Sequence, residues 1–464
     1  MTTISATRRD GSSATVDDAA QDALGSAVHG EVFTQNSDGY DAARAVWNGM
    51  IDKRPSIIIK CQGVSDVVNA VKFAREHDLL IAIRGGAHNV AGHGTTDGGI
   101  VIDTSGMKGV RVDPAAKTAH AQPGLTWAEF DDETLAYGLA TTGGTVSNTG
   151  IAGLTLGGGL GWLMGKHGLT CDNVISVDLV TPNGELITAS ANEHPDLYWA
   201  LRGGGGNFGV VTSFQFQLHE VGPQVIGGMI IHPMANARDL MRFYRDMTAD
   251  PPDELELYMA LMTSPDGDPV AAIMTGYNGD PAAGEKVIKP IREFGSPLAD
   301  MIQPMPYGAR QHMLDDFAPH GPRRYWKSGF LPELSDDVID VFVKHASNLI
   351  SPMTGIPIFN MHGAATRVDP GATAFGHRKH QWDIDIVSQW LDPADDERQT
   401  EWTRRFWSDL EPFAGDTIYV NHISGDEPSR IETAFGSNYA RLREVKGKYD
   451  PENVFKLNHN IPPA

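Results

Sequence analysis

A short apolar run that stops abruptly in a glycine loop is the feature that most constrains this chain. Ile81 to Arg84 form the run, and Gly85 to His88 follow directly. The pattern predicts a short buried strand that ends in a loop. Glycines there permit positive φ angles and let a ligand approach the backbone closely. Successive backbone N–H groups in such a loop can bind an anion such as a pyrophosphate, and we expect Arg84 and His88 at the rim of that site.

A second glycine-rich stretch runs from Thr141 to Gly161. So many glycines cannot build a sturdy helix or strand, because each one costs backbone entropy on folding. The apolar residues Val146, Ile151 and Leu154 within it are unlike those of a flexible linker. We therefore expect a long loop that lies against a ligand.

A third glycine-rich stretch, Arg202 to Thr212, has the spacing G-x-G-x-x-G at Gly204, Gly206 and Gly209. A dinucleotide-binding fingerprint must follow a strand and open a helix. Here the pattern predicts a helix before the glycines, over Pro195 to Leu201, and a strand after them. The sequence therefore disfavours an NAD-dependent dehydrogenase of the Rossmann type.

Three segments resemble the berberine bridge enzyme-like oxidases, which are flavoproteins of the vanillyl-alcohol oxidase type. The segments are Arg84 to His88, Gly206 to Thr212 and Tyr449 to Pro462, and the resemblance extends from about Gly30 to the C-terminus. It implies a two-domain α+β fold, in which an FAD-binding domain of the PCMH type is joined to a substrate domain of antiparallel sheet covered by helices. It also implies FAD bonded covalently to His88.

The resemblance assigns FAD contacts to the glycine loops and to the C-terminal part of the chain. These residues are Arg84, Gly85, Gly86, Ala87, His88 and Asn89 in the first loop, Ser147, Thr149, Gly150, Ala152, Gly153 and Leu154 in the second, Val211 at the adenine end, and Asn421 and Asn458 near the isoalloxazine ring. Thr149 falls where relatives control the access of oxygen, many of them with an aliphatic residue. Doubly tethered relatives carry a cysteine where this chain has Val146, so a single linkage through His88 is expected.

The expected organisation has four parts. Residues 1–28 are polar and are expected to form a mobile arm, residues 29–222 the FAD-binding domain, residues 223–416 the substrate domain, and residues 417–464 a segment that returns to the FAD domain. The first domain should begin strand–helix–strand and contain a helix over 126–139 and a hairpin over 172–190. In the substrate domain, alternation predicts strands at 225–231, 255–262, 270–274, 356–362 and 382–390 and a helix over 334–350. An amphipathic helix is predicted over 428–449.

Two side chains of the substrate domain are candidates for a catalytic base. Asp385 interrupts the apolar run from Trp382 to Trp390, where an unpaired carboxylate would be costly unless it is paired or useful. It also falls within about a residue of a glutamate that some relatives place on this strand. Tyr258, in another alternating strand, is the second candidate. Each has an ordinary alternative, Tyr258 as a packed ring and Asp385 as a carboxylate facing water, and an amine substrate can need no base.

The net charge and the cysteine content limit the binding partners and the cellular compartment that we expect. The net charge of −22 argues against nucleic acid and anionic membranes as partners. Cys61 and Cys171 are the only cysteines, which fits a reducing compartment. The polar N-terminus is unlike a signal peptide, and no apolar run is long enough to span a membrane. A cytoplasmic protein without a metal site is expected, with His377 to His380 as a solvated loop.

The expected function is an FAD-dependent oxidase of a small organic substrate, in which hydride passes to flavin N5 and O2 is reduced to H2O2. A flavin-dependent oxygenase or cyclase of secondary metabolism is the alternative enzyme, and a ligand-binding protein that kept the fold is the non-enzymatic one. The sequence leaves open whether the substrate is an alcohol, an amine, a sugar or a phenolic or polyketide-like molecule. It also leaves the oligomeric state open.

Overall fold

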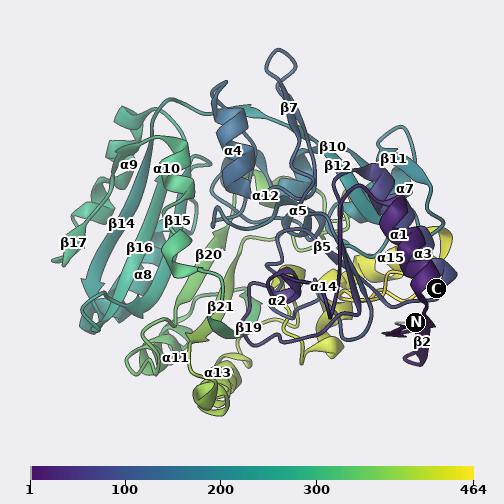
Figure 1. Cartoon of the computed structure of the whole chain (residues 1–464). Helices are drawn as coiled ribbons and strands as arrows, with labels where there is room; N and C mark the ends of the chain where they lie inside the picture. The colour runs from purple at the N-terminus through teal and green to yellow at the C-terminus, as the bar shows by residue number, and fades with distance from the viewer. Residues whose placement is uncertain (1–2) are drawn as a thin grey trace.

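The computed structural model describes residues 3–464 and shows two halves side by side (Figure 1). One half holds a four-stranded and a five-stranded sheet, and the other is built on a single large sheet. This is the α+β arrangement that the resemblance implied. Within residues 3–464, no helix is both long and apolar enough to cross a membrane.

The four-stranded sheet begins strand–helix–strand, as predicted. Its order is β3-β4-β6-β5, and β4 (Ile57–Lys60), β6 (Ile100–Asp103) and β5 (Ile81–Arg84) run parallel, with β3 (Glu31–Thr34) antiparallel at the edge. Helix α3 (Val64–Glu76) makes the crossover and buries its apolar stripe against the sheet. Parallel strands place their C-terminal ends at one edge, so the loop after β5 emerges there.

The five-stranded sheet is antiparallel and has the order β11-β10-β12-β8-β7. Its strands are β7 (Val110–Asp113), β8 (Thr118–Ala121), β10 (Val174–Val180), β11 (Leu186–Ser190) and β12 (Val210–Gln217). The hairpin of β10 and β11 and helix α7 (Pro195–Leu201) form as predicted. Helix α4 (Trp127–Leu135) begins after Thr126, whose side chain forms a capping box with Glu129.

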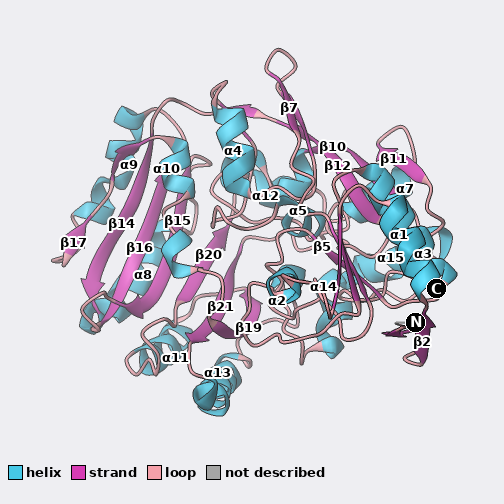
Figure 2. Ribbon diagram, in the orientation of Figure 1, coloured by secondary structure: helices cyan, strands magenta, loops and turns pink. Residues whose placement is uncertain are grey.

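The large sheet has eight antiparallel strands and contains every strand predicted for the substrate domain (Figure 2). In spatial order these are β17 (Ala299–Asp300), β14 (Val225–Pro233), β16 (Pro269–Tyr277), β15 (Leu255–Thr263), β20 (Ile356–Met361), β21 (Gln381–Trp390) and β19 (Arg323–Leu331), with β18 (Gln303–Met305) also on β14. Strand β19 was not predicted.

Helices cover one face of the large sheet, and the other face is turned toward the first half. The covering helices are α8 (Ala237–Met247), α9 (Pro281–Arg292), α11 (Asp336–Ala346) and α13 (Asp396–Leu410). Ile230, Ile273 and Ile358 pack under these helices. Their neighbours Met229 and Met274 instead belong to a core shared with the second glycine stretch. The alternation of the strands therefore sets which side chains face the other half.

The remaining elements are short. They are α2 (Tyr40–Arg44), β9 (Leu139–Ala140), α5 (Ile151–Leu156), α6 (Met164–His167), β13 (His219–Glu220), α10 (Tyr307–Gln311), α12 (Ala364–Arg367), α14 (Ile431–Phe435) and α15 (Tyr439–Tyr449).

The N-terminal region differs from the mobile arm expected over residues 1–28. Residues 1 and 2 lie outside the described residues, but β1 (Ile4–Thr7), β2 (Ser13–Val16) and α1 (Asp18–Ala27) follow. Val16 and Leu24 are buried in the same core as the four-stranded sheet. A few apolar side chains are enough to pack this segment on the core. The polar composition of the segment hid them from the sequence reasoning.

Two predictions for the second half of the chain need correction. The helix over 428–449 is broken into α14 and α15, because Gly436 takes a φ of 52° between them. The segment His377 to His380 is a loop in which Lys379 and His380 are exposed, but Arg378 is buried and forms a bidentate ion pair with Asp172.

The C-terminal segment packs through Ile418, Val420 and Ile461 on the core of the five-stranded sheet.

Candidate functional site

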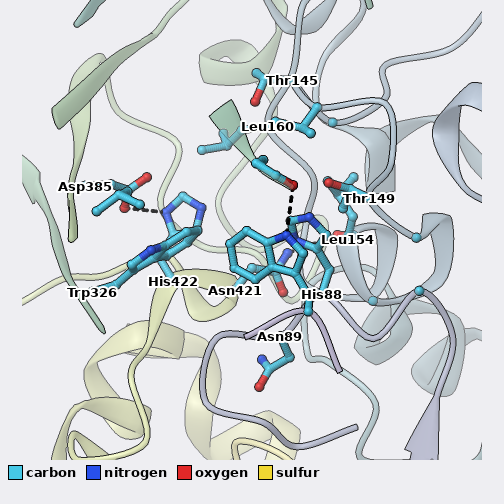
Figure 3. Close-up of a pocket in the computed structure, with 18 of the residues that line it drawn as sticks. His88, Asn89, Thr145, Thr149, Leu154, Leu160, Trp326, Asp385, Asn421 and His422 are labelled. Carbon is cyan, nitrogen blue, oxygen red and sulfur yellow. Dashed lines mark hydrogen bonds and ion pairs between the residues drawn. The ribbon is translucent and has the colours of Figure 1, made fainter. Parts of the chain in front are cut away.

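A single long cavity of about 920 Å³ lies between the two halves. All three glycine stretches line it from the first half, the large sheet lines it from the other, and residues 419–422 and 455–459 complete it. In Figure 3, Asp385 and His422 lie on one side and His88, Thr149 and Leu154 on the other, with Asn421 between them. The cavity is therefore assembled from segments far apart in the sequence.

The first and second glycine loops touch each other through their backbones. A β-carbon built on Gly86 would lie 2.5 Å from both Cα and N of Gly150, and one on Gly150 would meet Gly86 equally closely. No side chain fits at either position. The next residue, Ala87, has a φ of 56°, a left-handed conformation that residues with a Cβ rarely adopt. The tight contact and the strained residue together direct His88 into the cavity.

The imidazole of His88 is held between a ring and an amide. Trp47 stacks on it with ring centroids 4.0 Å apart, and Nε2 lies 3.1 Å from Oδ1 of Asn148. The amide of Asn148 is oriented by its Nδ2, which donates to the carbonyl of Ala318 at 3.1 Å. Oδ1 can then only accept, so Nε2 of His88 carries the hydrogen and Nδ1 keeps its lone pair.

His88 is also kept neutral. Burial lowers its pKa to about 3, and His320 and Arg324 act in the same direction. A neutral imidazole with a free Nδ1 is a nucleophile, whereas the protonated ring is not. The environment of His88 therefore suits a residue that forms a bond to a bound group.

Arg84 has a different role from the one expected. It lines the cavity, but its guanidinium is 2.6 Å from Asp103 and donates to the carbonyl of Ala43 at 2.5 Å. Both charged side chains are buried. The guanidinium therefore links β5 to β6 and to α2. The prediction that Arg84 is free at the rim of an anion site was wrong.

The second glycine stretch is a loop interrupted by the six-residue helix α5 (Ile151–Leu156). Of the residues expected to contact FAD, five line the cavity: Thr149, Gly150, Ala152, Gly153 and Leu154. Val146 lines it as well. Ser147 does not, because its hydroxyl donates to Asp315 at 2.6 Å and lies 2.9 Å from Nδ1 of His312. Ser147 therefore joins the second glycine loop to the other half.

The other predicted contacts also reach the cavity. Gly85, Gly86, Ala87, Asn89, Val211, Asn421 and Asn458 line it together with His88. The side chain of Asn421 fills the space beside Gly157, and its Nδ2 donates to the hydroxyl of Tyr419 at 2.7 Å. Asn458 lies against Gly206 of the third stretch. Both asparagines come from the returning C-terminal segment, so that segment closes the cavity.

Asp385 lies in the cavity wall and is paired. Its Oδ1 is 2.9 Å from Nδ1 of His422, and Oδ2 of Asp383 is 3.2 Å from the same nitrogen. Asp385 and His422 line the cavity, whereas Asp383 is fully buried behind them. Asp385 therefore does not face bulk water, and one imidazole is shared by two carboxylates.

The three groups shift one another's pKa values. Burial alone would lower the pKa of His422, but the carboxylates of Asp385 and Asp383 outweigh it and raise that pKa to about 10. Burial and the charge of Asp385 raise the pKa of Asp383 to about 6, although His422 opposes them. Near neutral pH His422 is therefore protonated and Asp383 is ionised, so the cluster can accept a proton.

His422 was missed by the sequence reasoning. It directly follows Asn421, which was predicted to contact FAD, and a titratable residue beside a predicted contact was the available signal.

Tyr258 was predicted as a candidate base, but the structure places it outside the cavity lining. Its ring is covered by Trp162, with centroids 4.6 Å apart, and its hydroxyl lies 3.5 Å from Glu256. Tyr258 is a packed ring, and it is not a candidate base.

The residues present fit a long flavin nucleotide. Two glycine loops leave no room for side chains where their backbones meet, and a neutral histidine with a free nitrogen lies beside them. The wall opposite offers a carboxylate cluster that can take up a proton. FAD needs backbone donors and a place for substrate over its ring, and it needs a nucleophile only if it is to be tethered; these residues fit the last two.

Comparison with known proteins gives two family matches. Residues 55–190 match the FAD binding domain model, and residues 418–462 match the model described as berberine and berberine like. An FAD-linked oxidoreductase of Dictyostelium discoideum is 34% identical over 442 residues, which cover 94% of this chain and 95% of that protein.

Two solved structures resemble the whole chain. The 6-hydroxy-D-nicotine oxidase of Arthrobacter nicotinovorans is 27% identical with a TM-score of 0.86, and the match covers 94% of this chain and 98% of that one. A berberine bridge enzyme-like protein of Physcomitrella patens is 25% identical with a TM-score of 0.86, covering 96% and 99%. The fold is therefore shared with these two proteins over nearly the full length.

Proposed function

Because the chain belongs to the berberine-like FAD-linked oxidoreductases, we propose that it is an oxidase of a small organic substrate that uses O2 as electron acceptor. The observation that carries this proposal is the arrangement of the cavity, in which the neutral His88 faces the Asp385–His422 cluster. His88 is placed to tether the cofactor, and the cluster is placed to accept a proton from an alcohol substrate.

His88 is the proposed attachment point of FAD. Its Nδ1 is the nitrogen left free by the hydrogen bond to Asn148, and we assign it the bond to the flavin 8α carbon. A single linkage is proposed, because the second loop offers Val146 at the cavity. Cys171 is buried and outside the lining, and burial raises the pKa of its thiol to about 12, so it is a poor second nucleophile.

Asp385 is the proposed proton acceptor. A bound FAD would supply the hydride acceptor, at N5, and a route for the two electrons to O2. Oxidation of an alcohol carbon to a carbonyl also releases the hydroxyl proton, and Asp385 can receive it at the cavity wall. His422 holds the carboxylate in place by the 2.9 Å contact, and Asp383 behind it positions His422.

Thr149 lines the cavity within the second glycine loop and is the residue we propose to influence the access of O2. A cytoplasmic location is proposed from the cysteines, since Cys61 and Cys171 are both free and buried. Small molecules are the only partners proposed.

The experiment that tests the proposed function measures flavin reduction and peroxide together. A panel of alcohols, amines, sugars and phenols is mixed with the purified protein without oxygen, and bleaching of the flavin identifies substrates. Oxygen is then admitted, and an oxidase forms one H2O2 for each substrate oxidised. Product that contains an oxygen atom from ¹⁸O2, with little peroxide, would identify an oxygenase and overturn the proposal.

A further inference from the structure

Much of the cavity face of the large sheet is apolar. Side chains alternate along each strand, so every second residue of β14, β15, β16 and β20 faces the cavity half. The cavity-lining members of this face are Met229, Ile231, Ala260, Met262, Met274 and Phe359, which we call the apolar wall. Met229 and Met274 are paired across neighbouring strands, so they form a continuous surface.

One carboxylate interrupts the surface, at its end. Ala260 of β15 is paired with Pro357 of β20. The pairs Ile358–Ile384 and Gly355–Val387 between β20 and β21 place Pro357 opposite Asp385. Asp385 is thus beside the apolar wall on the same face of the sheet. A molecule that lies on the wall would place one end against this carboxylate.

Gln389 and Thr354 line the cavity beside the wall and already have hydrogen-bond partners. The amide of Gln389 accepts from Nε of Arg324 at 2.7 Å and donates to the carbonyls of Phe317 and Met353 at 3.1 and 2.9 Å. The hydroxyl of Thr354 accepts from the backbone N–H of Gln389. The amide of Gln389 therefore has little capacity left to bind the hydroxyls of a ligand.

Two exposed side chains that line the cavity are also apolar. Met301 is 55% exposed and Phe317 is 46% exposed, and both line the cavity. Large exposed apolar side chains that gather at a cavity are typical of a ligand-binding surface. Methionine adapts its shape and makes favourable sulfur contacts with aromatic rings.

Resting on the proposed function for this cavity, we infer that the substrate has a flat aromatic body of two or more rings, which lies on the apolar wall, and one oxidisable alcohol or amine carbon beside Asp385. A sugar does not suit this surface. Each hydroxyl left without a partner on the wall would reduce affinity by roughly 5- to 150-fold. An apolar ring gains affinity from the same burial, by about fivefold or more for each added ring.

The test uses the flavin-loaded protein and a graded set of probes. Benzyl alcohol, 2-naphthalenemethanol and 9-anthracenemethanol differ in the number of fused rings, and D-glucose and cellobiose represent sugars. Binding is measured by the change in the flavin absorption spectrum, and reduction by its bleaching without oxygen. We expect affinity to rise from one ring to two by about fivefold or more, and both sugars to bind at least 100-fold more weakly than 2-naphthalenemethanol.

A pair of variants assigns the effect to the wall. Met262→Gln places a polar group on it and should weaken binding of 2-naphthalenemethanol about tenfold while changing benzyl alcohol less. The matched control Met247→Gln lies on α8, on the other face of the sheet and outside the cavity lining, and should leave both affinities unchanged.

Several outcomes would overturn the inference: sugars that bind as tightly as the aromatic alcohols, affinity that does not depend on the number of rings, or a spectrum that no aromatic probe perturbs. Efficient reduction by a sugar would overturn the substrate class and support the oxidase. Tight aromatic binding with no reduction by any probe would support the substrate class and count against the oxidase.

Discussion

At the residue scale, neighbouring groups determine the chemistry of His88 and Asp385. His88 is made neutral by burial, and Asn148 leaves its Nδ1 free. Asp385 shares the imidazole of His422 with Asp383, so two carboxyl groups lie against one imidazole. These arrangements are not visible in the sequence, because Asn148 is far along the chain from His88 and His422 is far from Asp385.

The base assignment predicts a specific loss. Asp385→Asn removes the proton acceptor but keeps the shape of the side chain, so the rate of flavin reduction by an alcohol should fall by about 100-fold or more. The matched control is Asp409→Asn, which removes the carboxylate of another aspartate–histidine pair, 2.8 Å from His345 and outside the cavity. Single-turnover reduction without oxygen measures both. Wild-type rates in Asp385→Asn across pH would withdraw the assignment.

The same cluster predicts a pH dependence. Below the raised pKa of Asp383, about 6, a carboxylate of the pair holds a proton and the cluster cannot accept another. The reduction rate should therefore rise with pH through a midpoint near 6 and stay high, since His422 loses its proton only near pH 10. Asp383→Asn removes the carboxyl group that titrates there, so the midpoint near 6 should be lost. A midpoint that does not move in this variant would contradict the coupling.

At the element scale, the glycine loops show what the sequence could predict. The loop after β5 and the third glycine stretch were identified because the backbone conformation and close approach leave glycine no substitute. Five strands of the large sheet were predicted from alternation, whereas the short β17 and β18 and the long β19 were not. Arg324 and Lys327 obscure the pattern of β19, and they are buried only because Gln389 and Glu427 lie opposite. Ser147 and Tyr258 were misassigned because the direction of a side chain depends on partners that the sequence does not reveal.

The contact between the two glycine loops gives a prediction at this scale. Gly86→Ala forces a methyl group into the backbone of Gly150 and should separate the loops, so flavin content should fall several-fold and the protein should be less stable. The control is Gly63→Ala, where a β-carbon meets nothing within 4 Å. The ratio of flavin to protein absorbance and the unfolding midpoint are the measurements. Full flavin content in Gly86→Ala would show that the loops do not need this contact.

At the scale of the whole molecule, the cavity exists because the two halves and the returning C-terminal segment hold together. A buried ion pair contributes to this: Arg378, from the connection between β20 and β21, holds both oxygens of Asp172 at 2.7 Å. The backbone of the same segment also lies against Arg202 and Trp199 of the first half. The sequence could not show this junction, because 206 positions separate the two charges.

Removing one partner of that pair should destabilise the protein strongly. Arg378→Ala leaves the carboxylate of Asp172 without its partner in a buried site and should reduce the free energy of unfolding by about 3–5 kcal/mol. Arg367→Ala breaks a bidentate pair with Asp253 that is largely exposed, and its effect should stay under about 1 kcal/mol. Denaturant unfolding of both variants makes the comparison, and equal effects would show that the buried pair does not join the halves.

The central claim is that His88 holds FAD in the cavity between the halves. Proteolytic digestion of the purified yellow protein, followed by mass spectrometry, tests it most directly. We predict the mass of the flavin on the peptide that contains His88 and on no other, with colour retained in the acid-precipitated protein and released from His88→Ala. An unmodified His88 peptide with all flavin in the acid supernatant, or a flavin on the peptide that contains Cys171, would contradict the account.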